Sequence, residues 1–544
     1  MKCLIILAVV ASVAGMARAG VGDVKISTDR TVDTSSLAAI VKGLRLEELP
    51  DNDARAIRVY EFCRQMLYHR QCPQEAFATV GPLKAINVYG WSLCGSLHTI
   101  LQALYNEYGW KTRYRGWHGH MTMEVHYDGR WHYLDIFMGC YFRTRDKKTI
   151  AGQDDIIADP DIVRKAVEEG RVPTPYMPCG DSPEGVVQGV KGSVPWDPAA
   201  GHDPAAVTVI DVGGTARAEG VDHPSAARLR LKEDPAYSTA VRLQSGMRLT
   251  LAWAPAENGQ FGINGKQTAP GHTCGIKDFR ADPKLGPILM PYGRRSWANG
   301  ELVYAPDFAN PAAWEDLAVR ENVAVRDGVV VPVKPGRPAY VGLRIQGPYV
   351  CSLAKAAAEW SSDDPGNGLE VSLDGQSWRK VPPPEPTAPA AAAPTTASMA
   401  AAWLRPGEQD LTMGRYDKDG VLGRYGFYVR ASVVTGLKKL TVTEMVEHNR
   451  CAQPYLVNGP NEITVTLDDA AALRKNRLFV TYAYAEGRGK PARPRYPFDG
   501  TAYEWGPEKT VRKEVTATPF RFTIDVGGDT PPNMVSLTRE LLPR

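Results

Sequence analysis

The sequence predicts an α+β region near the N-terminus, followed by all-β regions built from antiparallel strands. First, apolar residues repeat at helical spacing between residues 51 and 108, and an alternating hairpin pattern follows them. Second, short β-prone runs recur between turn residues from about residue 206 onward. Third, glycine (51) and proline (42) are abundant, which favours strands and turns over long helices. The 544 residues are enough for roughly three or four domains.

The composition is that of an ordinary globular protein, with 43% hydrophobic and 23% charged residues. The net charge of +3 gives no argument for a nucleic acid or an anionic membrane as a partner. After the N-terminal segment no stretch is long and apolar enough to span a bilayer. We therefore expect no nucleic-acid partner and no integral membrane segment.

The first residues read as a secretory signal peptide. Lys2 supplies a short positive region, residues 4–16 are mostly apolar, and Ala17-Arg18-Ala19 matches a cleavage signal. The apolar run is too short and too close to that signal for a membrane anchor, and no cysteine follows the cleavage site. We expect export to the periplasm, the extracellular space or the cell surface. An uncleaved N-terminus that is apolar by chance is the alternative.

Changes in composition divide the remaining chain. A stretch rich in Pro, Gly and Asp precedes the β-prone runs and reads as a linker. A low-complexity stretch reads as an insertion in one sandwich, because "SWRKV" before it and "YGFYVRASV" after it fit strands of one sheet. The expected units are a signal peptide (1–19), an α+β domain (20–180, core 50–145), a linker (181–205), a β-rich domain (206–350) and one or more β-rich sandwich domains (351–544) with the insertion 381–402.

Two helices precede the hairpin in the α+β domain. Residues 51–70 carry apolar side chains at near-helical spacing. Residues 92–108 show the clearest pattern, a continuous apolar stripe that Gly109 is well placed to end. A further helix is expected near 159–170. The stripe consists of Leu93, Leu97, Ile100, Leu101, Leu104, Tyr105 and Tyr108.

A β-hairpin follows these helices. Asp128-Gly129, between two alternating segments, predicts a two-residue type I′ turn. That turn places Thr122 opposite Asp135, so His120 and Asp135 share a face as diagonal neighbours, with Cβ atoms roughly 7–8 Å or less apart. A slip of one residue would reverse this facing. The other face is expected to be a core layer of Met121, Met123, Val125, Leu134 and Ile136.

Cys94 is the candidate nucleophile. It lies in the first turn of the clearest helix, where unpaired N–H groups and the helix dipole favour a thiolate. Its backbone N–H can face a substrate carbonyl and so form part of an oxyanion hole. A cysteine nucleophile needs a base and a group that orients the base. His120 and Asp135, which are expected to share a face of the hairpin, are the candidates for these two roles.

The segments "GWSLCGSLHTILQALYNEYGWKTRYRGW" and "HMTMEVHYDGRWHYLD" resemble the transglutaminase-like superfamily, relatives of papain-type cysteine enzymes. The resemblance covers about residues 50–145 and implies a papain/transglutaminase-like fold for the N-terminal domain. It implies Cys94 as nucleophile, His120 as base and Asp135 as the residue that orients the base. The departures are Met121-Thr122, where the family usually has Ala-Trp, and the residue after Asp135, which is often proline.

Other readings of these residues remain open. Trp91 and Asn87, just upstream of Cys94, are candidate second oxyanion donors. Cys94 as a buried core residue or as half of a disulfide is the alternative to a nucleophile. His118 could replace His120 as the base, and the histidines at 118, 120, 126 and 132 could hold a metal ion. His98 is expected on the polar side of its helix. No C-x-x-C motif is present, which argues against a Cys-rich zinc site, and no second dense cluster of ligands supports a metal. We expect no metal and no cofactor.

The expected function is that of an exported transglutaminase-like cysteine enzyme that acts on amide or peptide bonds of a protein or peptide substrate through an acyl-enzyme. Hydrolysis is favoured over cross-linking by analogy with the family. The alternative is a catalytically inactive surface protein whose β-sandwich modules bind polysaccharide, protein or another cell-surface component. The run "LEVSLDGQSW" has the texture of such modules, although this texture is common in β proteins.

Overall fold

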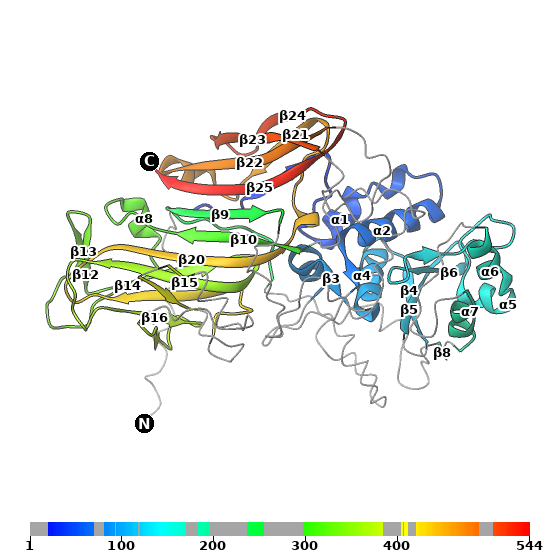
Figure 1. Ribbon diagram of the computed structural model, residues 1–544, viewed down its shortest axis with the longest axis horizontal. Helices are drawn as coiled ribbons and strands as arrows, with labels where there is room; N and C mark the ends of the chain where they lie inside the picture. The colour runs from blue at the N-terminus through cyan, green and yellow to red at the C-terminus, as the bar shows by residue number, and fades with distance from the viewer. Residues whose placement is uncertain are drawn as a thin grey trace, which may run out of the picture.

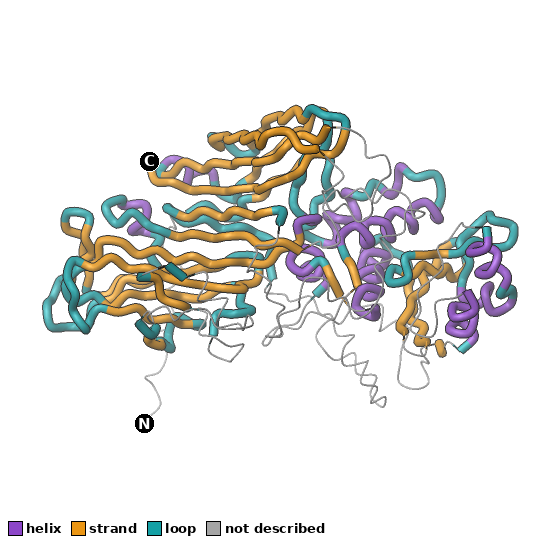
Figure 2. The backbone as a smooth tube through the Cα atoms, in the orientation of Figure 1, coloured by secondary structure: helices purple, strands orange, loops and turns teal. Residues whose placement is uncertain are grey.

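The computed structural model describes residues 20–69, 81–92, 94–117, 120–169, 183–192, 194–195, 237–254, 297–383, 404–405, 407–411, 420–488 and 504–544. The expected signal peptide, residues 1–19, lies outside them. Helices gather at one end of the molecule and long strands fill the other (Figures 1 and 2). Within the described residues the strands pair antiparallel, apart from the short parallel pair of β2 and β3. The chain is therefore mostly β, as the sequence predicts.

The expected helices begin and end close to where the sequence places them. Asp51 caps α2, accepting a hydrogen bond from Ala54 N at 2.7 Å. Gly109 follows α4 with a φ of 97°, a left-handed conformation that glycine adopts without strain. The helices of this part are α1 (Leu37–Gly43), η1 (Leu46–Glu48), α2 (Asn52–Met66), α3 (Pro82–Lys84), η2 (Ala85–Tyr89), α4 (Cys94–Glu107), α5 (Gln153–Ala158), α6 (Asp161–Glu168) and α7 (Pro183–Lys191).

A five-stranded sheet accompanies these helices, in the order β7-β6-β5-β4-β8. Helix α4 lies next to β4 and β5, and α5–α7 form the outer layer (Figure 1). The strands of this part are β2 (Tyr68–His69), β3 (Trp91–Ser92), β4 (Lys111–Trp117), β5 (His120–Tyr127), β6 (Arg130–Asp135), β7 (Cys140–Tyr141) and β8 (Val194–Pro195).

The expected linker 181–205 is wrong in its first half. Val186, Val187 and Val190 are fully buried on α7, which packs against α5 and α6. Strand β8 then pairs with β4. The valines give this glycine-rich helix an apolar face, so residues 183–195 belong to the helical part. Residues 196–205 lie outside the described chain.

The β part contains three sheets. A ten-stranded sheet follows the order β12-β13-β20-β10-β9-β25-β22-β23, and β15 and β18 join it through β20. A five-stranded sheet (β11-β14-β19-β16-β17) and a three-stranded sheet (β1-β21-β24) share its hydrophobic core. One short helix, α8 (Pro311–Glu315), and two 3-10 turns, η7 (Arg450–Ala452) and η8 (Ala470–Arg474), lie between strands.

The expected β-prone runs lie on β9, β14, β16, β17, β19–β22 and β24, and the run at 206–212 lies outside the described residues. The other strands of these sheets were not among the expected runs. The strands of the three sheets are β1 (Lys25–Thr28), β9 (Met247–Ala252), β10 (Trp297–Tyr304), β11 (Val319–Glu321), β12 (Val323–Arg326), β13 (Val329–Pro332), β14 (Tyr340–Gln346), β15 (Val350–Trp360), β16 (Gly368–Ser372), β17 (Arg379–Lys380), β18 (Glu408–Asp410), β19 (Gly426–Ser432), β20 (Leu437–Asn449), β21 (Gly459–Thr466), β22 (Asn476–Arg488), β23 (Glu504–Val515), β24 (Phe520–Val526) and β25 (Thr530–Pro543).

The strand pairing corrects the expected division of the β region at residue 350. β10 pairs with β20, and β14 pairs with β19, so both sides of that boundary build the same sheets. The start of the chain also joins this region, because β1 pairs with β21. β17 and β19, which flank 381–402, lie in one sheet on either side of β16, as the expected insertion requires. Most of the insertion itself lies outside the described residues.

The helical and β parts are joined at the end of β20. Asn449 Nδ2 donates to the carbonyl oxygens of Met66 (2.8 Å) and Ile86 (2.6 Å). Cys451, in the turn that follows, is buried in the core of the helical part. Satisfied hydrogen bonds between buried groups fix this junction. None of the helices in the described residues has both the length and the apolar character needed to cross a membrane.

Candidate active site

The β5–β6 hairpin sets the relation between two of the candidate residues. Asp128 and Gly129 both have positive φ angles, 49° and 75°, as a type I′ turn requires. Glu124 pairs with Tyr133, which is the register that the two-residue turn predicts. His120 Nε2 lies 2.8 Å from Asp135 Oδ2.

Asp135 is fully buried, and several groups surround its carboxylate. Tyr133 donates its hydroxyl hydrogen to Oδ2 at 2.8 Å, and the backbone N–H of Met138 donates to Oδ1 at 2.7 Å. Burial opposes the charged form, but the nearby imidazoles of His120 and His98 hold the pKa of Asp135 well below its usual range. The carboxylate is therefore a fixed negative charge in the interior.

His120 is 3% exposed, and aromatic rings surround its imidazole. The ring centroids of Phe137 and Trp117 lie 4.8 Å and 5.5 Å away. Burial alone would lower the pKa of His120, but the charge and hydrogen bond of Asp135, with a smaller effect from Cys94, raise it to about 10. Nε2 is hydrogen-bonded to Asp135, while no well-aligned hydrogen bond to the buried Nδ1 is found within the described residues.

Cys94 is the first residue of α4, forms no disulfide and is partly exposed. Its side chain is close enough to His120 to raise the pKa of the imidazole through a hydrogen bond and through charge. Since Nε2 faces Asp135, Nδ1 is the nitrogen left for the sulfur. The structure thus brings Cys94, His120 and Asp135 together in the order in which the sequence suggests they act.

His98 is a member of this cluster that sequence reasoning missed. Expected on a polar helix side, it is fully buried, because α4 is covered on nearly all sides. Its Nδ1 donates to the Cys94 carbonyl at 2.8 Å, and its Nε2 lies 3.5 Å from Asp135 Oδ1. The spacing of four residues from Cys94 was the available signal, since it places both residues on one helix face.

The two candidate oxyanion donors fare differently. The prediction of Asn87 as an oxyanion donor is wrong, because its Nδ2 donates to the carbonyl oxygens of Thr34 (3.0 Å) and Leu83 (2.9 Å). One amide hydrogen therefore holds residue 34 against η2, and the other is used by the carbonyl of Leu83 on α3. Trp91 lies on β3, three residues before Cys94. Its ring packs edge-on against that of Tyr89, with the ring centroids 5.6 Å apart. Its part in an oxyanion site stays a prediction.

His132, another histidine of the hairpin, lies in the core and contacts groups outside the candidate site. His132 Nδ1 donates to the Ile150 carbonyl at 2.7 Å, and the ring stacks on Tyr127 with centroids 3.6 Å apart. Burial lowers the pKa of His132, which favours its neutral form. His118 lies outside the described residues, and within those residues no group of three or more His, Cys, Asp or Glu is arranged to hold a metal ion.

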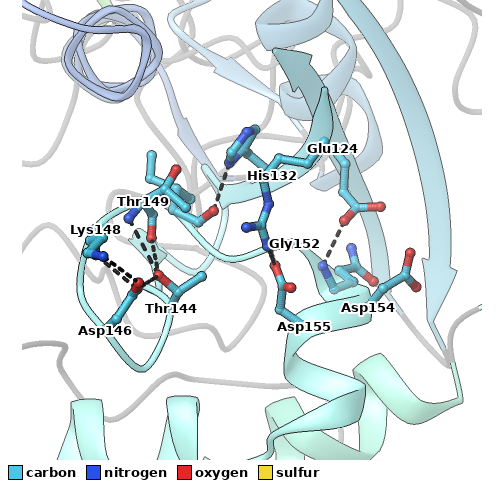
Figure 3. Close-up of polar contacts among 12 residues, drawn as sticks. Glu124, His132, Thr144, Asp146, Lys148, Thr149, Gly152, Asp154 and Asp155 are labelled. Carbon is cyan, nitrogen blue, oxygen red and sulfur yellow. Dashed lines mark hydrogen bonds and ion pairs between the residues drawn. The ribbon is translucent and has the colours of Figure 1, made fainter. Parts of the chain in front are cut away.

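The face of the hairpin that carries His120 and Asp135 is also covered by other parts of the chain. Glu124 is fully buried, forms an ion pair with Arg113 at 2.7 Å and accepts the backbone N–H of Gln153 at 2.7 Å. Burial raises the pKa of Glu124 despite the nearby arginine. Figure 3 shows Glu124 of β5 reaching the start of α5. Asp155 of α5 accepts hydrogen bonds from the Gly152 backbone N–H and from the Arg130 guanidinium of β6. These contacts fasten β5 and β6, which carry His120 and Asp135.

The geometry suits nucleophilic acyl transfer: a thiol at a helix N-terminus, an imidazole beside it, and a buried carboxylate behind the imidazole. Comparisons of the chain with family models, curated proteins and solved structures found no match.

Proposed function

We propose that this protein is an exported cysteine enzyme that acts on amide or peptide bonds through an acyl-enzyme. The observation that carries the proposal is the position of His120, whose Nε2 is 2.8 Å from Asp135 and whose imidazole interacts with the Cys94 side chain. The sequence resemblance to the transglutaminase-like superfamily supports the same reading, and so do the signal-peptide features of residues 1–19.

The reaction begins when the Cys94 thiolate attacks the carbonyl carbon of the substrate amide. The carbonyl oxygen gains negative charge, and the N-terminal end of α4 offers backbone N–H groups and the positive end of a helix dipole to stabilise it. His120, protonated on Nδ1, gives that proton to the leaving amine as the C–N bond breaks. The product is a thioester between the acyl group and Cys94.

Water then resolves the thioester, with His120 accepting its proton, and the carboxylic acid product leaves. An amine in place of water would give a cross-linked product. Asp135 keeps the imidazole oriented and stabilises its protonated form throughout, because a buried carboxylate next to imidazolium makes a strong charge-assisted hydrogen bond. Hydrolysis of a protein or peptide substrate is the activity we propose, by analogy with the resembled family.

Thiol alkylation and acyl transfer test this proposal together. At neutral pH, iodoacetamide should label Cys94 in the purified protein faster than it labels N-acetylcysteine, and p-nitrophenyl acetate should acetylate Cys94 in a stoichiometric burst. Intact-mass and peptide-mass spectra report both products. His120→Ala should abolish the burst and return labelling to the rate of an ordinary thiol.

His126→Ala is the matched control, because His126 lies on the same strand, is partly exposed and packs on Trp131. It should leave both rates unchanged. Labelling of native Cys94 no faster than the free thiol, with no acetyl burst, would favour the inactive surface protein instead.

A further inference from the structure

A cavity of about 260 Å³ lies outside the candidate active site. It opens where the start of the chain, the η2 segment and the last strand of the β part meet. Its lining includes Lys25, Asp33, Asn87, Tyr349, Gln453 and Arg539, and it does not include Cys94, His120 or Asp135. The hydrogen bonds of Asn87 that remove it from the oxyanion role help to form this wall.

Arg539 supplies a buried positive charge to the cavity. It lies inside the ten-stranded sheet on β25, where it pairs with Val480 of β22 and Leu249 of β9. It is 4% exposed, and its Nε and Nη1 have no hydrogen-bond partner within the described residues. Burial lowers the pKa of Arg539, and the groups whose charge opposes this shift are the buried phenols of Tyr349 and Tyr482. An unpaired charge in the interior is costly, so the site is incomplete without an anion.

The acidic residues of the cavity do not serve as that anion. Asp33 forms an ion pair with Lys25 at 2.5 Å and accepts the backbone N–H of Ser35 at 3.0 Å. Asp23, the other acid in the lining, is exposed to solvent. Tyr349 donates its hydroxyl hydrogen to Gln453, 3.3 Å away. The guanidinium of Arg539 is therefore the positive group that an incoming ligand can satisfy.

We propose that this cavity binds a small organic monocarboxylate, with Arg539 pairing to the carboxylate. A planar guanidinium matches a carboxylate through two parallel hydrogen bonds. Lys25 is already neutralised by Asp33, and Asp23 is exposed to solvent, so the single buried charge of Arg539 fits a monoanion better than a doubly charged phosphate. The volume is below the range of drug-sized pockets, which limits the ligand to the size of an amino acid, an aromatic acid or a sugar acid.

Calorimetric titration and thermal unfolding of the purified protein test the proposal, in a low-chloride buffer because chloride competes for the guanidinium. Benzoate and glucuronate are the carboxylate probes, with benzamide, glucose and inorganic phosphate as matched controls. At least one carboxylate should bind and raise the melting temperature in proportion to the logarithm of its concentration. Its neutral partner should do neither.

Arg539→Met keeps the length of the side chain and removes the charge. It should weaken carboxylate binding by roughly tenfold or more, as the loss of a charge-assisted hydrogen bond implies. It should fold at least as stably as the native chain without ligand, because it removes an unpaired buried charge. Arg521→Met, at an exposed arginine of β24, should leave binding unchanged.

Three results would overturn the proposal. One is the absence of any carboxylate effect on the native protein. Another is equal carboxylate binding by the native protein and Arg539→Met. The third is a response to phosphate without a response to either carboxylate. Acylation of Cys94 is measured separately, so the result for this cavity stands apart from that for the active site.

Discussion

His120 Nε2 lies 2.8 Å from Asp135 Oδ2, and both side chains are almost completely removed from water. A buried pair of this kind is maintained only if the charges stay matched, because either charge alone would be strongly disfavoured. Burial and charge act in opposite directions on both pKa values, and charge prevails on each. In the proposed mechanism, Asp135 therefore acts on Cys94 through the imidazole of His120.

Asp135→Asn tests this dependence with little change in shape. The amide cannot stabilise imidazolium, so His120 should be largely neutral at pH 7 and Cys94 acylation should slow by roughly 10²–10⁴-fold. The measurement is the acetyl burst rate with p-nitrophenyl acetate, and circular dichroism checks that the variant is folded. Asp161→Asn, at a half-exposed acid on α6, should keep the native rate. A native rate in Asp135→Asn would remove Asp135 from the mechanism.

His98 is expected to act as a positioning residue. His98→Asn keeps a donor near the Cys94 carbonyl but loses the approach to Asp135 Oδ1. His98 helps to lower the pKa of Asp135, so the pKa of this carboxyl should rise in the variant. As the pH is lowered, the variant should therefore lose acylation activity at a higher pH than the native protein does, and its rate at neutral pH should be about tenfold lower. The pH profile of the burst distinguishes this from a packing defect, which would lower the rate equally at every pH.

Stability should depend on pH through His120. Its folded pKa is raised from 6.5 to about 10, so its stabilising contribution is complete below about pH 6.5 and is lost as the pH rises toward 10. The difference in unfolding free energy between the native chain and His120→Gln should therefore shrink between about pH 6 and about pH 9. Urea titrations at both pH values measure it. A constant difference would show that no proton is linked to this site, and His126→Gln serves as the control.

The expected cleavage after Ala19 leads to a further prediction. Gly20 N donates to Asp316 Oδ1 at 2.8 Å, and the carboxylate also accepts the N–H of Ser245 at 2.9 Å. Cleavage after Ala19 would turn the Gly20 nitrogen into an ammonium group facing a carboxylate that is 8% exposed. Asp316→Asn should then destabilise the processed protein by about 1–3 kcal/mol.

N-terminal sequencing of the processed protein should give Gly20 as the first residue. Thermal unfolding should show that Asp316→Asn destabilises a chain that retains residues 1–19 less than it destabilises the processed protein. Asp363→Asn, at an exposed acid, is the control. A first residue other than Gly20 would contradict the expected cleavage site.

Local chemistry in the sequence was sufficient for helices α2 and α4, for the β5–β6 hairpin and for one half of the site, but not for α7 or for strands such as β10 and β15. A two-residue turn at Asp128-Gly129 fixes the hairpin register, and a strand repeats every two residues, so the shared face of His120 and Asp135 follows from a few neighbouring residues. Helical periodicity likewise places Cys94 at the start of α4.

Tertiary packing decided the rest, because it depends on segments that are far apart in the chain and carry no common local signal. It placed the imidazole of His120 beside Cys94, buried His98, and directed Asn87 toward Thr34. It also paired β1 with β21 and buried Arg539 in the wall of a cavity, where its Nε and Nη1 have no hydrogen-bond partner among the described residues. Periodicity shows which side of an element is apolar, but only the assembled fold determines what covers its polar side.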